Sequence, residues 1–277
     1  MYKKVILIIA VIVMMSVNVF AADTYGGYNF PVDIDINGCF VKCVQKPIII
    51  EGTTYIPLRA FSDAIGGVIG WDENEDAATM KKGEHSFVFY PGKDYCLADG
   101  EKKDYAAIYY EELTFIPVRA VSELMGYNVE WDDFYLTVKI TAPDVVVATE
   151  CIDSSYTYED ILYLGKIIFI EGRYQPFETK LGIAGTIVNR VKSYQFPNTV
   201  KEVILDTKWG VQFPPAHTDK INNIPSNECI IAAKCALGGV NNIGNSLYFI
   251  DVKSAPKSWA HKNRTYYTTL HDMAFYE

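Results

Sequence analysis

The stretch TYEDILYLGKIIFIEG, which spans residues 157–172, decides the fold of the C-terminal half of the chain. Thr157 and Asp160 have the spacing of a capping box, so the sequence predicts a helix that begins here and covers residues 159–172. Apolar side chains recur in this helix at the three- and four-residue spacing that places them on one face. That face consists of Ile161, Leu164, Ile168 and, at its end, Glu171.

Glu171 is therefore a carboxylate on an apolar stripe, and we expect it to face the protein interior. Moving an ionised carboxylate into apolar surroundings is costly, so the pKa of Glu171 should rise and the group can hold a proton near neutral pH. A glycosidic general acid requires a carboxyl group of this kind, as in lysozyme. The alternative is that Glu171 pairs with Arg173 or Arg190 at a helix end.

A second helix is predicted over residues 178–192, where basic residues in the last turn complement the helix dipole. Its small residues Gly182, Ala184 and Gly185 should let it pack closely against the first helix. Later elements place helices before strands, which indicates an α+β domain. They are helices over 198–205, capped by Asn198, and 226–237, and strands over 246–252 and 265–270.

The N-terminal half contains an internal repeat. Residues 54–72 (TYIPLRAFSDAIGGVIGWD) and 114–132 (TFIPVRAVSELMGYNVEWD) share nine identities in nineteen positions at an offset of 60 residues. Each copy predicts an extended segment that ends at a proline, a short helix closed by a glycine, and a strand at the Trp-Asp pair. Further strands are predicted over residues 32–36, 86–90 and 135–140.

Each copy also repeats an arginine and a tryptophan, Arg59 with Trp71 and Arg119 with Trp131. One interpretation is a ligand site that is made twice. We favour the other, in which the arginine and tryptophan form a salt-bridged, aromatic part of the core of each copy.

Through these paired YIPLRA…G…WD motifs, residues 32–140 resemble the copper amine oxidase N-terminal-like domain, a module of Gram-positive surface proteins. The resemblance implies a duplicated α+β stalk or wall-association module. It does not imply copper chemistry here, because this half contains only His85 and lacks a set of metal ligands.

Residues 1–22 are predicted to be a secretory signal peptide, since Lys3 and Lys4 precede an apolar run at 5–15 and small residues follow. An uncleaved membrane anchor is the alternative. No later segment is long and apolar enough to span a bilayer, so we expect no stable membrane span after cleavage. The expected domains are the signal peptide (1–22), the repeat module (23–141), a linker (142–156) and a C-terminal domain (157–277).

Charge and cysteine usage exclude some classes of function. Residues 22–149 carry 10 basic and 21 acidic residues, whereas residues 150–277 carry 13 of each, so neither half has the basic face of a nucleic-acid binder. The six cysteines are too scattered for a disulfide scaffold, and we leave them unpaired. There is no CxxC, HExxH or close histidine pair, so we expect neither a metal nor a cofactor.

Beyond Glu171, a series of short motifs follows in a fixed order in the C-terminal half. In that order and spacing, the half resembles the spore cortex-lytic enzyme and cell wall hydrolase family. The motifs are Glu171-Gly-Arg173, Val188-Asn189-Arg190-Val191, Phe196-Pro197-Asn198-Thr199, Gln212-Phe213, Ala236-Leu237-Gly238-Gly239 and Leu247-Tyr248-Phe249.

The resemblance implies a lysozyme-like fold and cleavage of the bond between N-acetylmuramic acid and N-acetylglucosamine, and some family members are lytic transglycosylases acting on spore cortex. Glu171 stands at the position of the family's catalytic glutamate. Three departures bear on activity. Gln175 replaces a second glutamate, Lys180 a common glutamine, and Met273 a common histidine.

The missing second acid bears on the mechanism. Retaining and inverting hydrolases ordinarily need two carboxyl groups, about 5 Å or about 6.5 to 9.5 Å apart. A lytic transglycosylase needs only one, because the glutamate that protonates the leaving oxygen then takes the proton of the sugar's own 6-hydroxyl. Asp206, Asp219 and Glu228 are candidate partners for Glu171, although a solvated surface position is the favoured interpretation of each.

Four further residues are candidates for binding substrate. Asn189 and Gln212 can hydrogen-bond N-acetyl groups, Tyr248 can stack on a sugar, and Arg173 can orient Glu171 or a substrate carboxylate. For Asn189 the alternative is a structural hydrogen bond to backbone, and for Tyr248 it is a place in the core.

The sequence thus predicts a secreted enzyme of the cell wall or spore envelope that cleaves peptidoglycan glycan strands with Glu171 as its acid and base. Its expected partners are those strands and, through the N-terminal module, the wall itself. The alternative is a catalytically weakened wall-binding or scaffold protein.

Overall fold

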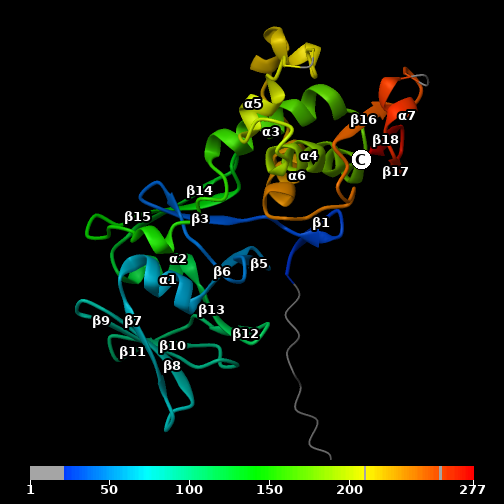
Figure 1. The fold of residues 1–277 in the computed structure, drawn as a ribbon. Coiled ribbons are helices and arrows are strands. Elements are labelled where there is room, and N and C mark those ends of the chain that lie inside the picture. The colour runs from blue at the N-terminus through cyan, green and yellow to red at the C-terminus, as the bar shows by residue number, and fades with distance from the viewer. Residues whose placement is uncertain (1–21, 209, 256–257) are drawn as a thin grey trace, which may run out of the picture.

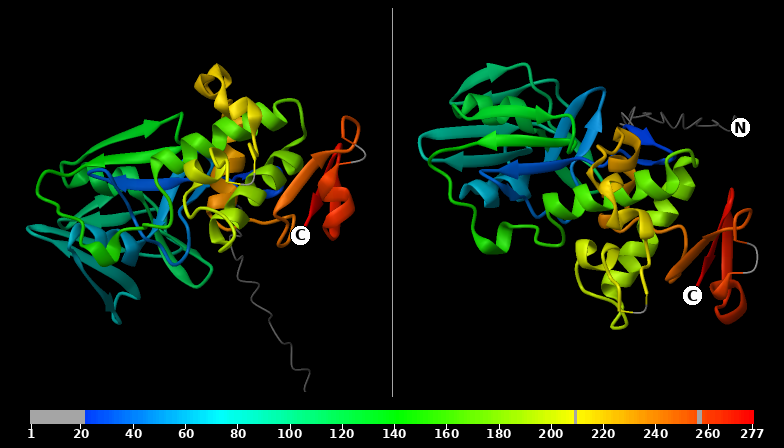
Figure 2. Two further views of the ribbon diagram at one scale, coloured as in Figure 1. Left: turned by 45° about the horizontal axis from the view of Figure 1, so that its top comes forward. Right: turned by 90° about the horizontal axis from the view of Figure 1, so that it is seen from above.

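The computed structural model describes residues 22–208, 210–255 and 258–277, so all but the last residue of the predicted signal peptide lies outside the described chain. A β-rich N-terminal unit lies beside a helical C-terminal unit that carries a small sheet (Figures 1 and 2). This is the mixed α and β architecture expected from the sequence. In the described part of the chain, no helix has the length and apolar character needed to cross a membrane.

The two copies of the sequence repeat fold into the same series of elements, strand, helix, strand and strand. Antiparallel pairing of the first strands, β6 and β13, sets Ile56 opposite Ile116, which are equivalent residues of the two copies. The copies therefore meet at matching positions. Their elements are β6 (Thr53–Pro57), α1 (Leu58–Ile65), β7 (Val68–Asp72) and β8 (Ala77–Lys82), then β13 (Leu113–Pro117), α2 (Val118–Leu124), β14 (Asn128–Asp132) and β15 (Thr137–Thr141).

The remaining strands extend these elements into larger sheets, with orders β11-β10-β9-β8-β7, β12-β13-β6-β5 and β14-β15-β3-β4. β3 is parallel to β15, whereas the other pairs in these sheets are antiparallel. A separate hairpin, β1 with β2, precedes them. The added strands are β1 (Thr24–Tyr25), β2 (Tyr28–Asn29), β3 (Asp33–Ile36), β4 (Cys39–Phe40), β5 (Ile48–Ile50), β9 (His85–Phe89), β10 (Cys96–Ala98), β11 (Glu101–Lys103) and β12 (Ile108–Tyr110).

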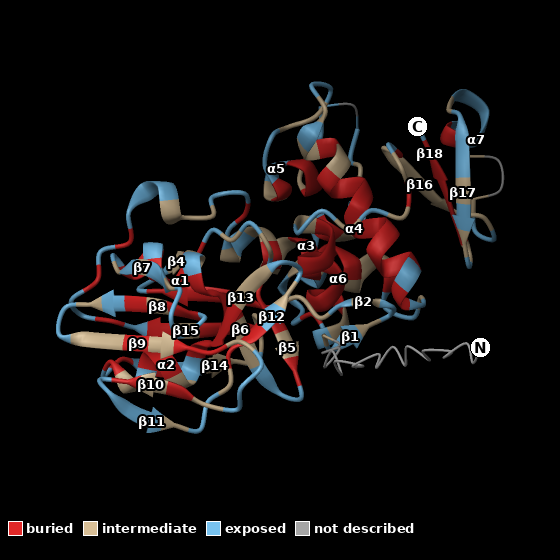
Figure 3. Cartoon of the chain, turned by 90° about the horizontal axis from the view of Figure 1, so that it is seen from below, coloured by how far each residue is buried: buried red, intermediate tan, exposed pale blue. Residues whose placement is uncertain are grey.

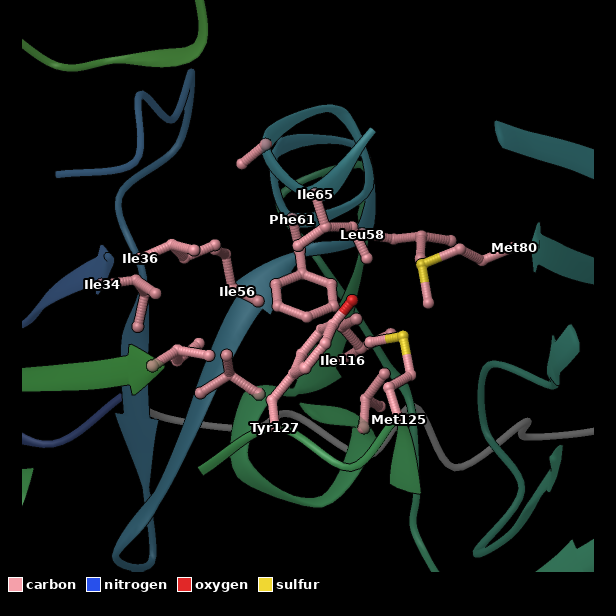
Figure 4. Close-up of a cluster of buried hydrophobic side chains, with 14 of the residues drawn as sticks. Ile34, Ile36, Ile56, Leu58, Phe61, Ile65, Met80, Ile116, Met125 and Tyr127 are labelled. Carbon is pink, nitrogen blue, oxygen red and sulfur yellow. The ribbon is translucent and has the colours of Figure 1, made fainter. Parts of the chain in front are cut away.

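The N-terminal core lies between the helices and the sheets of both copies. Ile56, Phe61 and Ile116 are fully buried at its centre, with Met80 and Met125 beside them (Figure 4). Burying such side chains removes apolar area from water, which stabilises the fold by about 1.5 to 3 kcal/mol for each large side chain.

The repeated arginines and tryptophans do not form the predicted core. Arg59 is exposed and Trp71 is 54% exposed. Trp71 lies on β7, which is the edge strand of its sheet. Trp131 is half-buried because it packs against the cores of both units. Arg119 is exposed and donates a 2.7 Å hydrogen bond to the Val129 carbonyl.

The segment predicted as a linker, residues 142–156, is packed against the N-terminal unit. Val145 and Tyr156 are buried. Asn37 donates to the carbonyls of Ala142 and Val145 at 2.7 and 2.9 Å, which fixes the start of the segment. The segment therefore connects the two units as ordered structure. The limits given above for the domains remain predictions.

The C-terminal unit is built on three helices, α3 (Tyr158–Gly172), α4 (Phe177–Lys192) and α6 (Asn227–Leu237). Most residues of α4 and α6 are buried, whereas α3 is buried along one side (Figure 3). The capping box at the start of α3 is present, with Thr157 and Asp160 bonded reciprocally. Asn198 is not the cap, because Thr199, one residue later, takes that position, and its hydroxyl accepts from the Glu202 N–H at 3.2 Å.

Short elements complete this unit. The sheet has the order β16-β18-β17, with β18 pairing both neighbours antiparallel. The elements are α5 (Val200–Ile204), two 3₁₀ turns η2 (Pro214–His217) and η3 (Asp219–Asn222), β16 (Tyr248–Asp251), α7 (Trp259–Asn263), β17 (Tyr266–Leu270) and β18 (Met273–Tyr276).

Gly182 and Gly185 of α4 face the C-terminal sheet and the loop before it, and not α3 as expected from the sequence. A Cβ on Gly182 would lie 2.7 Å from the Phe275 ring, and one on Gly185 would lie 3.1 Å from Ile243. Between α3 and α4, the close approach is at Gly172, where a Cβ would lie 2.7 Å from Ile183. These contacts bring the C-terminal sheet against the helices that carry the site.

The two units share a core instead of being joined by a flexible connection. Phe40 and Leu136 come from the N-terminal unit but are buried among the helices of the C-terminal unit. Lys234 of α6 is almost fully buried, and its ammonium group lies 2.9 Å from Asp33 Oδ2 and 2.7 Å from the carbonyl oxygens of Tyr135 and Leu136. Apolar packing and a buried ion pair therefore both fix the orientation of the units.

Candidate active site

Glu171 lies in the last turn of α3, where the apolar stripe ends. The three aliphatic residues of the stripe are fully buried, and Glu171 itself is half-buried. Its Oε1 atom is buried and has no hydrogen-bond partner among the described residues. Burial raises the pKa of Glu171, and the nearby positive charge of Lys220 opposes that rise. The site thus holds a carboxyl group that favours its protonated form more than an exposed glutamate does.

Glu171 lines a pocket of about 300 Å³ on the C-terminal unit. Arg173, Tyr174 and Gln175 line it from the loop after α3, and Lys220 and Asn223 line it from the region of η3. Tyr174 is 88% exposed, so an aromatic face is available at the rim. In the described part of the chain, Glu171 is the one carboxylate that lines this pocket.

The loop after Glu171 is fixed by a hydrogen bond from Lys180, the residue that stands where the family usually has a glutamine. Lys180 is 3% exposed, and its ammonium group contacts the Gln175 carbonyl oxygen at 2.6 Å and Glu228 Oε2 at 2.5 Å. The Tyr25 hydroxyl donates to Glu228 at 3.4 Å, so the first hairpin also reaches this network. The side chain of Gln175 contacts the His271 ring at 3.0 Å.

The candidate second carboxylates do not join Glu171. Glu228 is held by Lys180. Asp206 accepts from the Lys208 N–H at 2.9 Å, and Asp219 lies in the first turn of η3 without lining the pocket. Met273 is buried in β18, where it packs against Ile243 and Phe275.

The predicted substrate-binding residues do not lie together in one pocket. Arg173 lines the Glu171 pocket, with its guanidinium 4.8 Å from the Phe169 ring centre. Asn189 instead donates to the carbonyls of Gly244 and Ser246 at 2.8 and 3.0 Å, which is the structural alternative.

Gln212 and Tyr248 line a second pocket, of about 810 Å³, that shares no lining residue with the Glu171 pocket. We call it the aromatic pocket. It is lined by the aromatic residues Tyr194, Phe196, Tyr248 and Trp259 and by the polar residues Gln195, Lys208, Gln212 and Arg264.

Sequence reasoning missed Lys220, Trp259 and Arg264. Lys220 carries no local signal, because its approach to Glu171 depends on how η3 packs against α3. Trp259 and Arg264 lie in and just after the short helix α7, in a segment that carries none of the family motifs quoted above. No group of three or more histidine, cysteine, aspartate or glutamate side chains within the described ranges is placed to hold a metal ion.

Comparison with known protein families supports both halves of the sequence interpretation. Residues 174–276 match the family described as Cell Wall Hydrolase, and residues 35–140 and 102–160 match the Copper amine oxidase N-terminal domain. The resemblances drawn from the sequence motifs are therefore confirmed. The hydrolase match begins three residues after Glu171, so it does not include the proposed acid.

Several curated relatives are spore cortex-lytic enzymes. The protein from Bacillus cereus is 29% identical over 108 residues, which are 39% of this chain and 40% of the relative. The protein from Oceanobacillus iheyensis is 28% identical over 39% of this chain and 38% of its own length, and that from Bacillus subtilis is 27% identical over 44% and 38%. The chain thus spans about two fifths of the length of the curated relatives it matches.

Two solved structures are similar over the same region. The catalytic domain of the germination-specific lytic transglycosylase SleB from Bacillus anthracis is 26% identical, with a TM-score of 0.41, and the match covers 46% of this chain and all of that one. The catalytic domain of the Bacillus cereus SleB protein is also 26% identical, with a TM-score of 0.41, and the match covers 45% of this chain and 94% of that one.

Proposed function

We propose that this protein is an exported enzyme that cleaves the glycan strands of peptidoglycan, with Glu171 as its general acid and base. The observation that carries the proposal is a carboxyl group that lines a pocket, has a raised pKa, and has one buried oxygen without a hydrogen-bond partner among the described residues. The similarity to cell wall hydrolases and spore cortex-lytic enzymes supports the choice of polymer.

The pocket favours a lytic transglycosylase over a two-carboxylate hydrolase. Hydrolysis with retention or inversion ordinarily uses a second carboxylate to attack the sugar or to activate water. The lining residues include Gln175 where that acid would stand, and Glu228 is paired with Lys180. We therefore propose that the sugar's own 6-hydroxyl replaces water as the nucleophile.

In this mechanism, protonated Glu171 donates its proton to the glycosidic oxygen as the bond from that oxygen to C1 of N-acetylmuramic acid breaks. The resulting carboxylate then accepts the proton of the 6-hydroxyl as O6 bonds to C1 and closes a 1,6-anhydro ring. Glu171 ends protonated, as it began. Arg173 and Tyr174 line the same pocket, and we propose that they orient the strand.

The N-terminal unit is proposed to be a duplicated stalk that associates with the wall, and the C-terminal unit a lysozyme-like domain. Residues 1–22 are proposed to direct export, which places the enzyme in the cell wall or spore envelope. The alternative, a weakened wall-binding protein, draws support from the presence of Gln175, Lys180 and Met273 where the family usually has a glutamate, a glutamine and a histidine.

Product analysis separates these functions. Purified vegetative peptidoglycan and spore cortex are incubated with the mature protein and with Glu171→Gln, and the products are identified by mass spectrometry. Anhydro-muramyl ends that depend on Glu171 are expected. If the products carry reducing ends instead, the enzyme is a hydrolase and the proposed transglycosylase mechanism is wrong. Retention of wall without turnover by the natural sequence would favour the wall-binding alternative.

The pH dependence of the reaction should change when the positive charge of Lys220 is removed. Glu171 must be protonated to begin the reaction, so activity falls as pH rises through its pKa. Because the Lys220 cation lowers that pKa, Lys220→Met is expected to move the alkaline limb of the kcat/KM profile to higher pH. Lys192→Met, at an exposed lysine that does not line the pocket, is the control. An unchanged alkaline limb in Lys220→Met would show that the two groups are not coupled.

A further inference from the structure

The aromatic pocket has the composition of a carbohydrate site, although it holds none of the reacting groups. Its volume of about 810 Å³ is within the range of small-ligand sites. Tyr194 is 97% exposed and Trp259 is 57% exposed, so two aromatic faces are open to a ligand. Aromatic side chains with one apolar face and one polar edge are suited to a sugar ring, which is amphipathic in the same way.

Arg264 is fixed among these rings. Its guanidinium lies 4.8 Å from the ring centres of both Tyr248 and Trp259, and its Nη2 donates to the Tyr248 hydroxyl at 3.0 Å. Its Nε is buried and has no hydrogen-bond partner among the described residues. The aromatic rings therefore hold the planar cation in one orientation, and part of its donor capacity is unused.

The charge of the pocket is opposite to that of the chain. The chain has a net charge of −9, yet Arg264 lines the aromatic pocket and no carboxylate of the described chain does. The Arg190 guanidinium does not line the pocket but lies 5.5 Å from the ring centre of Tyr248, which does. The buried Nη1 of Arg190 has no hydrogen-bond partner among the described residues. Asp206 is the acidic group that interacts with Arg190 electrostatically. An anionic ligand would meet a local excess of positive charge.

We propose that the aromatic pocket binds a carboxylate-bearing amino sugar of the glycan strand, an N-acetylmuramic acid unit that keeps its free carboxylate. The sugar ring stacks on Trp259, and the carboxylate accepts hydrogen bonds from Arg264. Gln212 lines the same pocket and supplies an amide for the N-acetyl group. The identity of the polymer rests on the proposed function, but binding here is independent of cleavage at Glu171.

Binding is tested in the mature Glu171→Gln protein, so that strands are held and not cut. Three probes are titrated by calorimetry. The first is glycan strands stripped of stem peptides, so that they carry free lactyl carboxylates. The second is the same strands with those carboxylates converted to methylamides, and the third is neutral chitohexaose. Arg264→Gln is expected to weaken the carboxylate strands by about tenfold and to leave chitohexaose nearly unchanged. Trp259→Ala is expected to weaken all three probes, because stacking does not depend on charge.

Lys262→Gln removes an exposed cation from the same helix as Trp259 without touching the pocket, so it should bind like the parent protein. Arg264→Lys separates charge from geometry, since it keeps the cation and loses the planar fork. Thermal midpoints check that each variant is folded. Equal binding of carboxylate and methylamide strands, or folded Arg264→Gln and Trp259→Ala proteins that bind like the parent, would overturn the proposal. Absence of cleavage by the natural sequence would instead count against the proposed function alone.

Discussion

Glu171→Gln is expected to reduce the rate of glycan cleavage by about 10² to 10⁴, the range in which a general acid and base contributes. Glutamine keeps the size of the side chain but cannot donate a carboxyl proton or accept the proton of the 6-hydroxyl. Because the Glu171 pocket is lined by no other described carboxylate, no neighbour can replace it. The rate of release of soluble muropeptides from purified wall, normalised to folded protein, measures the effect.

Glu178→Gln is the matched control, because this exposed glutamate lies in the first turn of α4, close in sequence to the site but outside its lining. It should cleave at the parent rate. If Glu171→Gln releases muropeptides as fast as Glu178→Gln, the assignment of the acid is wrong and another group must protonate the leaving oxygen.

Lys234→Ala is expected to destabilise the protein by about 3 to 5 kcal/mol, because it leaves Asp33 as an uncompensated charge at a buried interface. The carbonyls of Tyr135 and Leu136 also lose the hydrogen bonds that the Lys234 ammonium group donates. For a chain of this size the loss corresponds to a fall in Tm on the order of 10 °C. Differential scanning calorimetry of the mature protein measures it.

Lys201→Ala provides the comparison for Lys234→Ala. Lys201 makes a 2.7 Å ion pair with Glu159, but both side chains are largely in solvent, so its loss should leave the Tm nearly unchanged. A Tm for Lys234→Ala equal to that for Lys201→Ala would mean that the buried pair does not hold the two units together.

Local patterns predicted the helices α1 to α6 but missed several strands, including the six-residue β8. The helix expected over 159–172 is α3 (Tyr158–Gly172), because its capping box and apolar period are properties of adjacent residues. The strand β18 (Met273–Tyr276) was missed, since all four residues are buried and a run this short has no alternation to detect. Gly182 and Gly185 were assigned to the wrong neighbour, because spacing identifies a slim face but not what packs on it.

Burial that depends on the other unit could not be predicted. Trp71 and Trp131 are equivalent in the repeat, yet only Trp131 is covered, because the C-terminal unit packs against that copy. The burial of Glu171 followed from its helix face, whereas the placement of Gln212 and Tyr248 in another pocket depends on the path of the chain between helices. The structural role of Asn189 was named beforehand as an alternative.

The ordered junction between the units also limits how the molecule can address an extended, layered polymer. A tethered enzyme could rotate and attack strands that run in any direction. Here the packing of Phe40 and Leu136 and the ion pair of Lys234 fix the orientation of the Glu171 pocket relative to the N-terminal sheets. If the N-terminal sheets bind the wall as proposed, that binding also sets the direction in which a glycan strand can approach Glu171, the proposed acid.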